Sequence, residues 1–84
     1  MSRTTLTDSE VMYMYLYNPL VWQVHPATMN PQAQVVQSID FDQEGEEIMT
    51  ADGRLYDRGG GSFDHPSRIF FTEQEAKDFC YQNT

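Results

Sequence analysis

The sequence predicts an α+β domain, a small antiparallel meander of three to five strands with an N-terminal and a C-terminal α-helix. Helix-start patterns occur near both ends, at Thr7–Glu10 and at Thr72–Glu75. Between them, residues 34–58 alternate apolar and polar side chains around two turn signals. A chain of 84 residues is expected to form one domain, residues 1–84, with a small core.

The N-terminal helix is predicted from the residues that follow Leu6. Thr7 and Glu10 have the spacing of a capping box, so the helix is expected to begin at about Asp8. It should end by residue 17 or 18, because the residue before Pro19 is pushed out of helical geometry. Valine and tyrosine at every second position from 11 to 17 leave a strand as the competing interpretation.

Two apolar or turn-rich segments follow this helix. Residues 20–25 lie between Pro19 and Pro26 and predict a short strand, while Asn18–Pro19 leaves a second short helix equally open. Residues 27–32 contain Asn30 and Pro31 and predict a loop.

The central meander takes its register from two-residue turns at Glu44–Gly45 and Asp52–Gly53. In that register Phe41 lies opposite Ile48 and Thr50 lies opposite Leu55. The face predicted to be core collects Val35, Ile39, Phe41, Ile48 and Leu55. The face predicted to be wet collects Val36, Ser38, Asp40, Asp42, Glu47, Met49, Arg54, Tyr56 and Arg58, with Glu47 opposite Arg58.

The C-terminal part begins with a glycine-rich loop over residues 59–66. Residues 68–71 predict a last short strand, and the capping-box spacing of Thr72 and Glu75 predicts the helix after it. Ala76, Phe79 and Cys80 share one face of that helix, which should pack on the sheet.

The formal net charge of −8 is concentrated in the middle of the chain. Residues 40–57 contain seven acidic side chains and one arginine, which leaves −6 in that segment. Such a field repels nucleic acid and anionic lipid, and it attracts cations and basic protein surfaces. Direct nucleic-acid binding is therefore disfavoured.

An acidic surface for a partner is predicted on the first hairpin of the meander. Five of the eight residues from 40 to 47 are acidic, and alternate residues on a strand form a row with a spacing of about 6.6 Å. Apolar contacts on the same face would hold a complex that charge attracts. The predicted contact residues are Asp40, Asp42, Glu44, Glu46, Glu47, Met49 and Tyr56. The alternative is a solvated face that is acidic only for solubility.

The segment 40–45 resembles the first half of an EF-hand calcium loop. Ala51 stands where that loop needs its bidentate glutamate, and no flanking helices are predicted. We therefore predict no metal site, although weak capture of a divalent ion by Asp40, Asp42 and Glu47 stays open.

A second candidate surface is aromatic. Tyr13 and Tyr17 share a helix face, Tyr15 points elsewhere, and Trp22 follows closely. Exposed tyrosine and tryptophan are typical of interfaces, so Tyr13, Tyr17 and Trp22 are candidate partner or homodimer contacts. The alternative is that the N-terminal helix uses these rings to fill the core.

Signs of catalysis are absent from the sequence pattern. His25, His65 and Cys80 show no spacing typical of a metal or nucleophile site, and Cys80 is expected in the core. No enzyme activity and no cofactor are predicted. A single cysteine favours a reducing compartment, the cytoplasm, and neither a signal peptide nor a membrane span is expected.

These observations favour a small acidic, non-enzymatic binding protein of the inhibitor kind that phages encode. Its expected partner is a basic, nucleic-acid-binding host protein, such as a CRISPR effector or a DNA-processing enzyme, blocked by occlusion or DNA mimicry. The alternative is an accessory subunit that oligomerises through its tyrosine and tryptophan surface.

Overall fold

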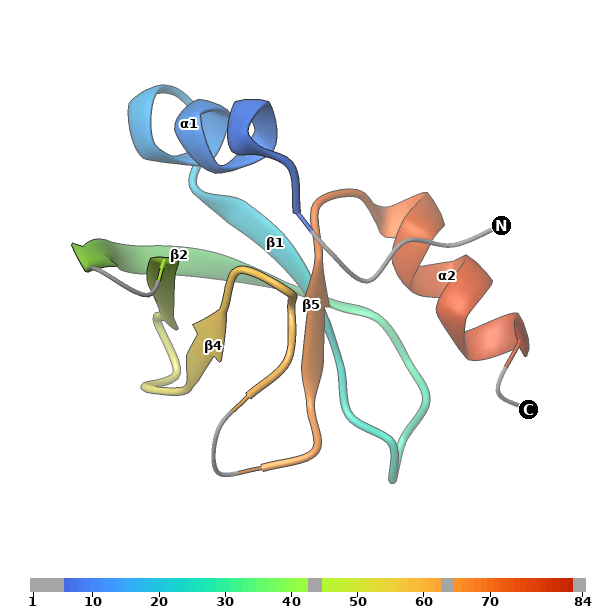
Figure 1. Cartoon of the computed structure of the whole chain (residues 1–84). Coiled ribbons are helices and arrows are strands. Elements are labelled where there is room, and N and C mark those ends of the chain that lie inside the picture. The colour runs from blue at the N-terminus through green and yellow to red at the C-terminus, as the bar shows by residue number, and fades with distance from the viewer. Residues whose placement is uncertain (1–5, 43–44, 63–64, 83–84) are drawn as a thin grey trace.

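The computed structural model describes residues 6–42, 45–62 and 65–82, and it has the predicted α+β architecture. The elements are α1 (Asp8–Leu16), β1 (Leu20–Val24), β2 (Gln32–Asp42), β3 (Gly45–Thr50), β4 (Leu55–Asp57), β5 (Arg68–Phe70) and α2 (Glu73–Gln82). The strands form one antiparallel sheet in the order β4-β3-β2-β1-β5 (Figure 1). The first four strands are therefore a meander, and β5 returns to pair with β1.

Both helices begin where their caps predict. The Thr7 side chain accepts a hydrogen bond from the Glu10 N–H, and the Glu10 carboxylate accepts one from the Thr7 N–H at 2.9 Å. The Thr72 hydroxyl likewise accepts from the Glu75 N–H. Residues 8–16 are thus helix rather than strand, and residues 20–24 are strand rather than helix.

The sheet bends at a β-bulge in β2, between Val36 and Ser38. Residues 32–35 of β2 pair with β1, whereas residues 36–42 pair with β3. We name β5, β1 and residues 32–35 half A, and residues 36–42, β3 and β4 half B. A bulge adds one residue to one strand, which turns the strand direction and increases its twist.

The two outermost strands, β4 and β5, are joined by the segment 60–62. The Asp57 N–H donates to the Gly61 carbonyl at 2.8 Å, and the Ile69 N–H donates to the Gly60 carbonyl at 2.8 Å. Isolated bridges link Tyr56 to Ser62 and Gly61 to Arg68. The sheet therefore curls toward a closed barrel, and both exposed edges find backbone partners.

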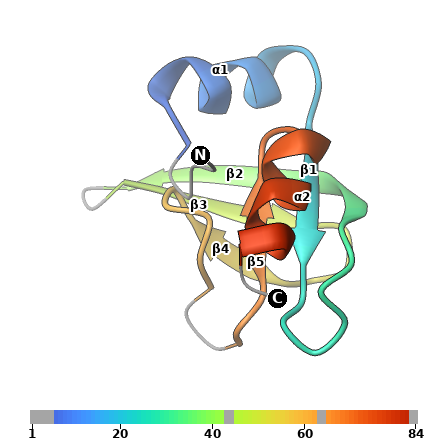
Figure 2. The ribbon, with the colours of Figure 1, turned by 90° about the vertical axis from the view of Figure 1, so that its right-hand side faces the viewer.

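The inner faces of the two halves share one core, which α1 covers (Figure 1). Its buried side chains are Leu6, Val11, Met14, Val21, Val36, Ile48, Tyr56 and Ile69. A second cluster lies on the outer face of half A, where Val24 and Phe70 pack against Ala76 and Cys80 of α2. Figure 2 shows α2 in front of β1 and β5. The predicted packing of α2 on the sheet is confirmed.

The second hairpin differs from its prediction by one residue. The Thr50 N–H donates to the Arg54 carbonyl, so the loop has three residues, 51–53, and Gly53 takes a φ of +85°. Ile48 consequently pairs with Tyr56, and Met49 pairs with Leu55. A shift of one residue exchanges the faces of a strand. Tyr56 is therefore in the core and Leu55 on the outer face, and the prediction for both was wrong.

The first hairpin and the bulge correct two further predictions. Ile39 pairs with Ile48 and Phe41 with Glu46, a register two residues from the predicted one, which leaves the faces unchanged. Gly45 lies inside β3 rather than in the turn, while Glu44 lies outside the described residues. The bulge puts Val36 in the core and leaves Val35 exposed, which reverses their predicted faces.

Candidate functional site: an acidic sheet face and an aromatic groove

A row of acidic residues crosses the outer face of half B from strand to strand. Asp40 of β2 pairs with Glu47 of β3, and Glu47 pairs with Asp57 of β4. Directly opposed residues have Cβ atoms about 4.5–5.5 Å apart. We name Asp40, Glu47 and Asp57 the acidic row. Among the residues that the structure describes, no lysine or arginine forms an ion pair with any of them.

This arrangement carries an electrostatic cost. Like charges directly opposite each other destabilise a pair of strands, and Glu47 has such a neighbour on both sides. Asp57 is partly compensated, because one of its carboxylate oxygens accepts the Gly61 N–H at 3.2 Å. A cationic partner would relieve the repulsion around Asp40 and Glu47.

The observed row crosses from strand to strand, whereas the predicted row followed alternate residues along one strand. The two rows also contain different residues. Asp40 and Glu47 lie in it, but Asp57 was predicted only as part of the segment charge. Glu46 instead lies on the inner-face side, 14% exposed, with the Arg58 guanidinium 3.8 Å away. The Asp42 side chain and Glu44 lie outside the described residues. The one-residue error in the second hairpin hid Asp57, since it placed Arg58 opposite Glu47.

Of the two apolar contacts predicted for this face, Met49 lies on it and Tyr56 does not. Met49 and Leu55 pair on the outer face and are both partly exposed. Tyr56 is fully buried in the core, so its predicted place on the binding surface was wrong. Half B thus presents an acidic row beside two aliphatic side chains.

An aromatic groove lies between α1, β1 and the start of α2. Its volume is about 570 Å³. The lining residues are Ser9, Glu10, Tyr13, Asn18, Leu20, Trp22, Phe71, Thr72 and Glu73. The rings of Tyr13 and Phe71 meet nearly edge to face, at 79° with centroids 5.9 Å apart. The structure therefore brings Tyr13 and Trp22, two predicted contact residues, to one site.

The third predicted aromatic residue, Tyr17, lies beside Tyr13 but is not among the residues that line the groove. Its ring lies 5.6 Å from that of Tyr13, and its side chain is 75% exposed. Tyr15 points to the other side of α1, where it meets Phe41 of β2 edge-on at 5.7 Å. The predicted separation of Tyr15 from Tyr13 and Tyr17 is confirmed, and the rings stay largely outside the core.

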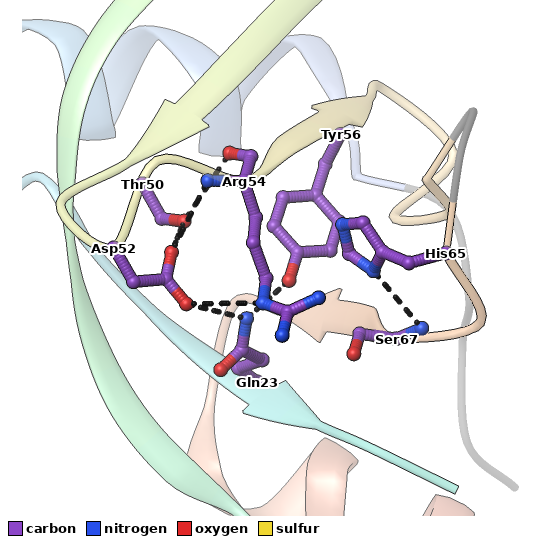
Figure 3. Close-up of polar contacts among 7 residues, drawn as sticks. All are labelled: Gln23, Thr50, Asp52, Arg54, Tyr56, His65 and Ser67. Carbon is purple, nitrogen blue, oxygen red and sulfur yellow. Dashed lines mark hydrogen bonds and ion pairs between the residues drawn. The ribbon is translucent and has the colours of Figure 1, made fainter.

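A polar cluster near the β3–β4 loop connects the two halves (Figure 3). The Gln23 side-chain amide of β1 donates to Asp52 Oδ2 at 3.2 Å and also to the Tyr56 hydroxyl. Asp52 accepts from the Thr50 hydroxyl and from the Arg54 N–H, and the Arg54 guanidinium lies 3.4 Å from it. Asp52 therefore holds the three-residue loop of half B against a strand of half A.

The pKa values in this cluster reflect its burial and its hydrogen bonds. Burial raises the pKa of Asp52, but hydrogen bonds from Thr50 and Gln23 outweigh it and hold that pKa below its ordinary value. Burial raises the pKa of Tyr56, and the nearby Asp52 carboxylate raises it further. Tyr56 is thus neutral at physiological pH, and its hydroxyl accepts a hydrogen bond from the Gln23 amide.

The two histidines and the cysteine take structural positions. His65 packs edge-on against Tyr56 at 5.2 Å, and its Nδ1 accepts the Ser67 N–H at 3.3 Å. His25 Nδ1 accepts the Ala27 N–H in a turn. Cys80 is buried as predicted, and burial raises the pKa of its thiol. These contacts stabilise turns and the core.

No protein-family model, no curated protein and no solved structure matches this chain. Over residues 6–42, 45–62 and 65–82, no group of three or more His, Cys, Asp or Glu side chains is placed to hold a metal ion. No helix in that part of the chain is long and apolar enough to span a membrane.

Proposed function

We propose that this protein is a non-catalytic binding domain that docks on a basic protein surface through the outer face of half B. The observation that carries the proposal is the acidic row, in which Asp40 and Glu47 face each other across two strands without a compensating cation among the described residues. Like charges in directly opposed positions on neighbouring strands cost stability. A basic partner recovers that cost when it binds.

The specific form that we propose is inhibition by occlusion. A row of carboxylates on a rigid sheet offers a basic groove a substitute for a short run of phosphates. A nucleic-acid-handling enzyme, such as a CRISPR effector or a DNA-processing enzyme, has such a groove. The inhibitor would occupy it and exclude the nucleic acid, and Met49 and Leu55 would supply apolar contact beside the charges.

Affinity capture from a host lysate tests this proposal, with duplex DNA as the competitor. We expect capture of a basic nucleic-acid-binding protein at about 50 mM salt and its loss at about 300 mM, as the Debye length falls from about 14 to about 6 Å. The double variant Asp40→Asn/Glu47→Gln should bind at least about tenfold more weakly, which corresponds to about 1.4 kcal/mol.

The matched control is Ala27→Lys/Asn30→Lys. It changes the net charge by the same two units, from −8 to −6, at exposed positions in the β1–β2 loop. We expect this control to keep binding within about twofold. Equal losses in both double variants would mean that only net charge matters, and capture that ignores both salt and DNA would refute docking through the acidic row.

A second candidate function is assembly of an accessory subunit through the aromatic side. The exposed, contacting rings of Tyr13 and Tyr17 favour it. Under this alternative the oligomeric state in sedimentation equilibrium changes when Tyr13 and Tyr17 become serine, and Asp40→Asn/Glu47→Gln has no effect on it.

A further inference from the structure

The aromatic groove is lined by both aromatic and acidic residues. The residues that line it include the aromatic Tyr13, Trp22 and Phe71 and the acidic Glu10 and Glu73. None of the described residues that line it is a lysine or an arginine. Aromatic faces and carboxylates both attract cations, so the two features select the same ligand chemistry.

The geometry suits a planar cation at the end of a long side chain. Tyr13 and Phe71 lie nearly perpendicular, so they form two adjacent walls of a corner. A guanidinium can stack on one ring while it donates hydrogen bonds to a carboxylate that lines the groove. The volume of about 570 Å³ accommodates the whole side chain and adjoining backbone.

An aliphatic ligand fits this lining less well. It would contact the aromatic side chains, but it would also take water from the exposed Glu73 carboxylate without donating a hydrogen bond to it. Glu73 is only partly neutralised, because its contact with Lys77 is a surface pair at 3.6 Å with both side chains about half exposed. The overall charge of −8 also favours a cationic ligand.

We propose that this groove binds an arginine side chain presented by a segment of a basic partner protein. The inference rests on the proposed function for its class of partner, but it assigns a different site. The inner faces of halves A and B share one core, so their outer faces point away from each other. The groove on the side of half A would thus make a second, separate contact from the acidic row of half B.

Tryptophan fluorescence tests the site directly, because Trp22 is the only tryptophan in the chain and it lines the groove. The probes are three capped glycine–serine peptides that differ only in a central arginine, citrulline or norleucine. Citrulline keeps the shape of arginine without its charge. We expect a saturable change with the arginine peptide, at an affinity at least about threefold above that for the other two.

Variants locate the binding within the groove. Tyr13→Leu keeps an apolar side chain but removes the ring, and Glu73→Gln removes a negative charge from the lining. Each should weaken binding of the arginine peptide by at least about threefold. Tyr15→Leu is the matched control, since Tyr15 lies on the same helix but packs against Phe41. Equal affinity for citrulline or norleucine, or no response to the arginine peptide, would overturn the proposal.

The acidic-row variant separates this inference from the proposed function. Asp40→Asn/Glu47→Gln should leave peptide affinity unchanged within about twofold, because those residues lie on the other half. If the arginine peptide does not bind but lysate capture still depends on Asp40 and Glu47, the arginine site is refuted and the proposed function stands. If the peptide binds but capture ignores Asp40 and Glu47, the docking surface is wrong and the arginine site stands.

Discussion

The outer faces of the two halves have the same strand geometry but opposite surroundings. On half A the outward side chains include Val24 and Phe70, and α2 covers them. On half B the corresponding positions hold Asp40, Glu47 and Asp57. The helix that packs on the outer face of the sheet, α2, contacts β1 and β5 of half A instead. The alternation of a strand fixes which residues point outward, but the residue types decide whether that face becomes core or surface.

The two outer faces also contribute differently to the free energy of folding. Half A gains free energy from apolar area that α2 removes from water. Half B accepts repulsion between neighbouring carboxylates on its outer face. The stability of the fold does not explain an outer face that costs free energy and covers no core, and this is why we propose that this face binds a partner.

The largest expected effect contrasts one outward residue from each half. Phe70 is fully buried under α2, with its ring 5.1 Å from that of Phe79, so Phe70→Ala should cost about 3–5 kcal/mol of unfolding free energy. Met49→Ala, on the uncovered face of half B, should cost less than about 1 kcal/mol. Urea denaturation of both variants measures the difference.

If Phe70→Ala prevents folding, Phe70→Leu serves in its place, with an expected cost of about 1.5 kcal/mol or less. Comparable costs at positions 49 and 70 would show that the outer face of half B is packed as firmly as that of half A. The contrast between the two halves would then be wrong.

Local patterns predicted the helices and the packing of α2, whereas the strand faces depended on single-residue details. The cap at Thr7 and the apolar positions Ala76 and Cys80 act over three or four residues, so the sequence displays them completely. Aspartate followed by glycine marks a hairpin, but a glycine with positive φ serves two-residue and three-residue loops alike. That ambiguity exchanged Leu55 and Tyr56.

The candidate site was also predictable only in part from the sequence. Asp40, Glu47, Tyr13 and Trp22 were identified from charge and aromatic content, which do not depend on register. Asp57 was missed, because only the true register places it beside Glu47. The bulge between Val36 and Ser38 has no local sequence signal. It lies where β2 changes its pairing partner from β1 to β3, which is a feature of the whole sheet. Phe71 and Glu73 join the groove only through the fold.

The next largest effect concerns the contact between the halves. Tyr56→Phe removes the hydroxyl that accepts from the Gln23 amide and leaves that buried amide with Asp52 as its remaining partner. We expect a loss of about 1–2 kcal/mol in thermal or urea unfolding. Tyr15→Phe removes a hydroxyl from an exposed ring and should change stability by less than about 0.5 kcal/mol. Equal effects would mean that the buried hydroxyl contributes nothing specific.

A pH dependence should report the same contact. The pKa of Asp52 is lower in the folded protein than its ordinary value of 3.8, so the folded state binds this proton less readily than the unfolded state. The stabilisation from Asp52 is therefore fully present above about pH 4, and it is lost as the pH falls through the folded pKa. Asp52→Asn should flatten this part of the stability curve between pH 5 and pH 2, measured by urea unfolding, relative to the native chain. A curve of unchanged shape would show that other carboxylates account for the acid loss.

The smallest effect has the opposite sign and gives the sharpest test of the comparison. Glu47 has an acidic neighbour on each side, so Glu47→Gln should stabilise the protein by about 0.2–1 kcal/mol at low salt while it weakens partner capture. Added salt screens the repulsion, and the gain should shrink toward zero at about 0.5 M. Differential scanning calorimetry at two salt concentrations measures it. A destabilised variant would mean that Glu47 makes a favourable contact within the domain, and the reason for assigning binding to half B would be lost. A variant that is more stable but binds less would show that half B retains this charge for a partner and not for the fold.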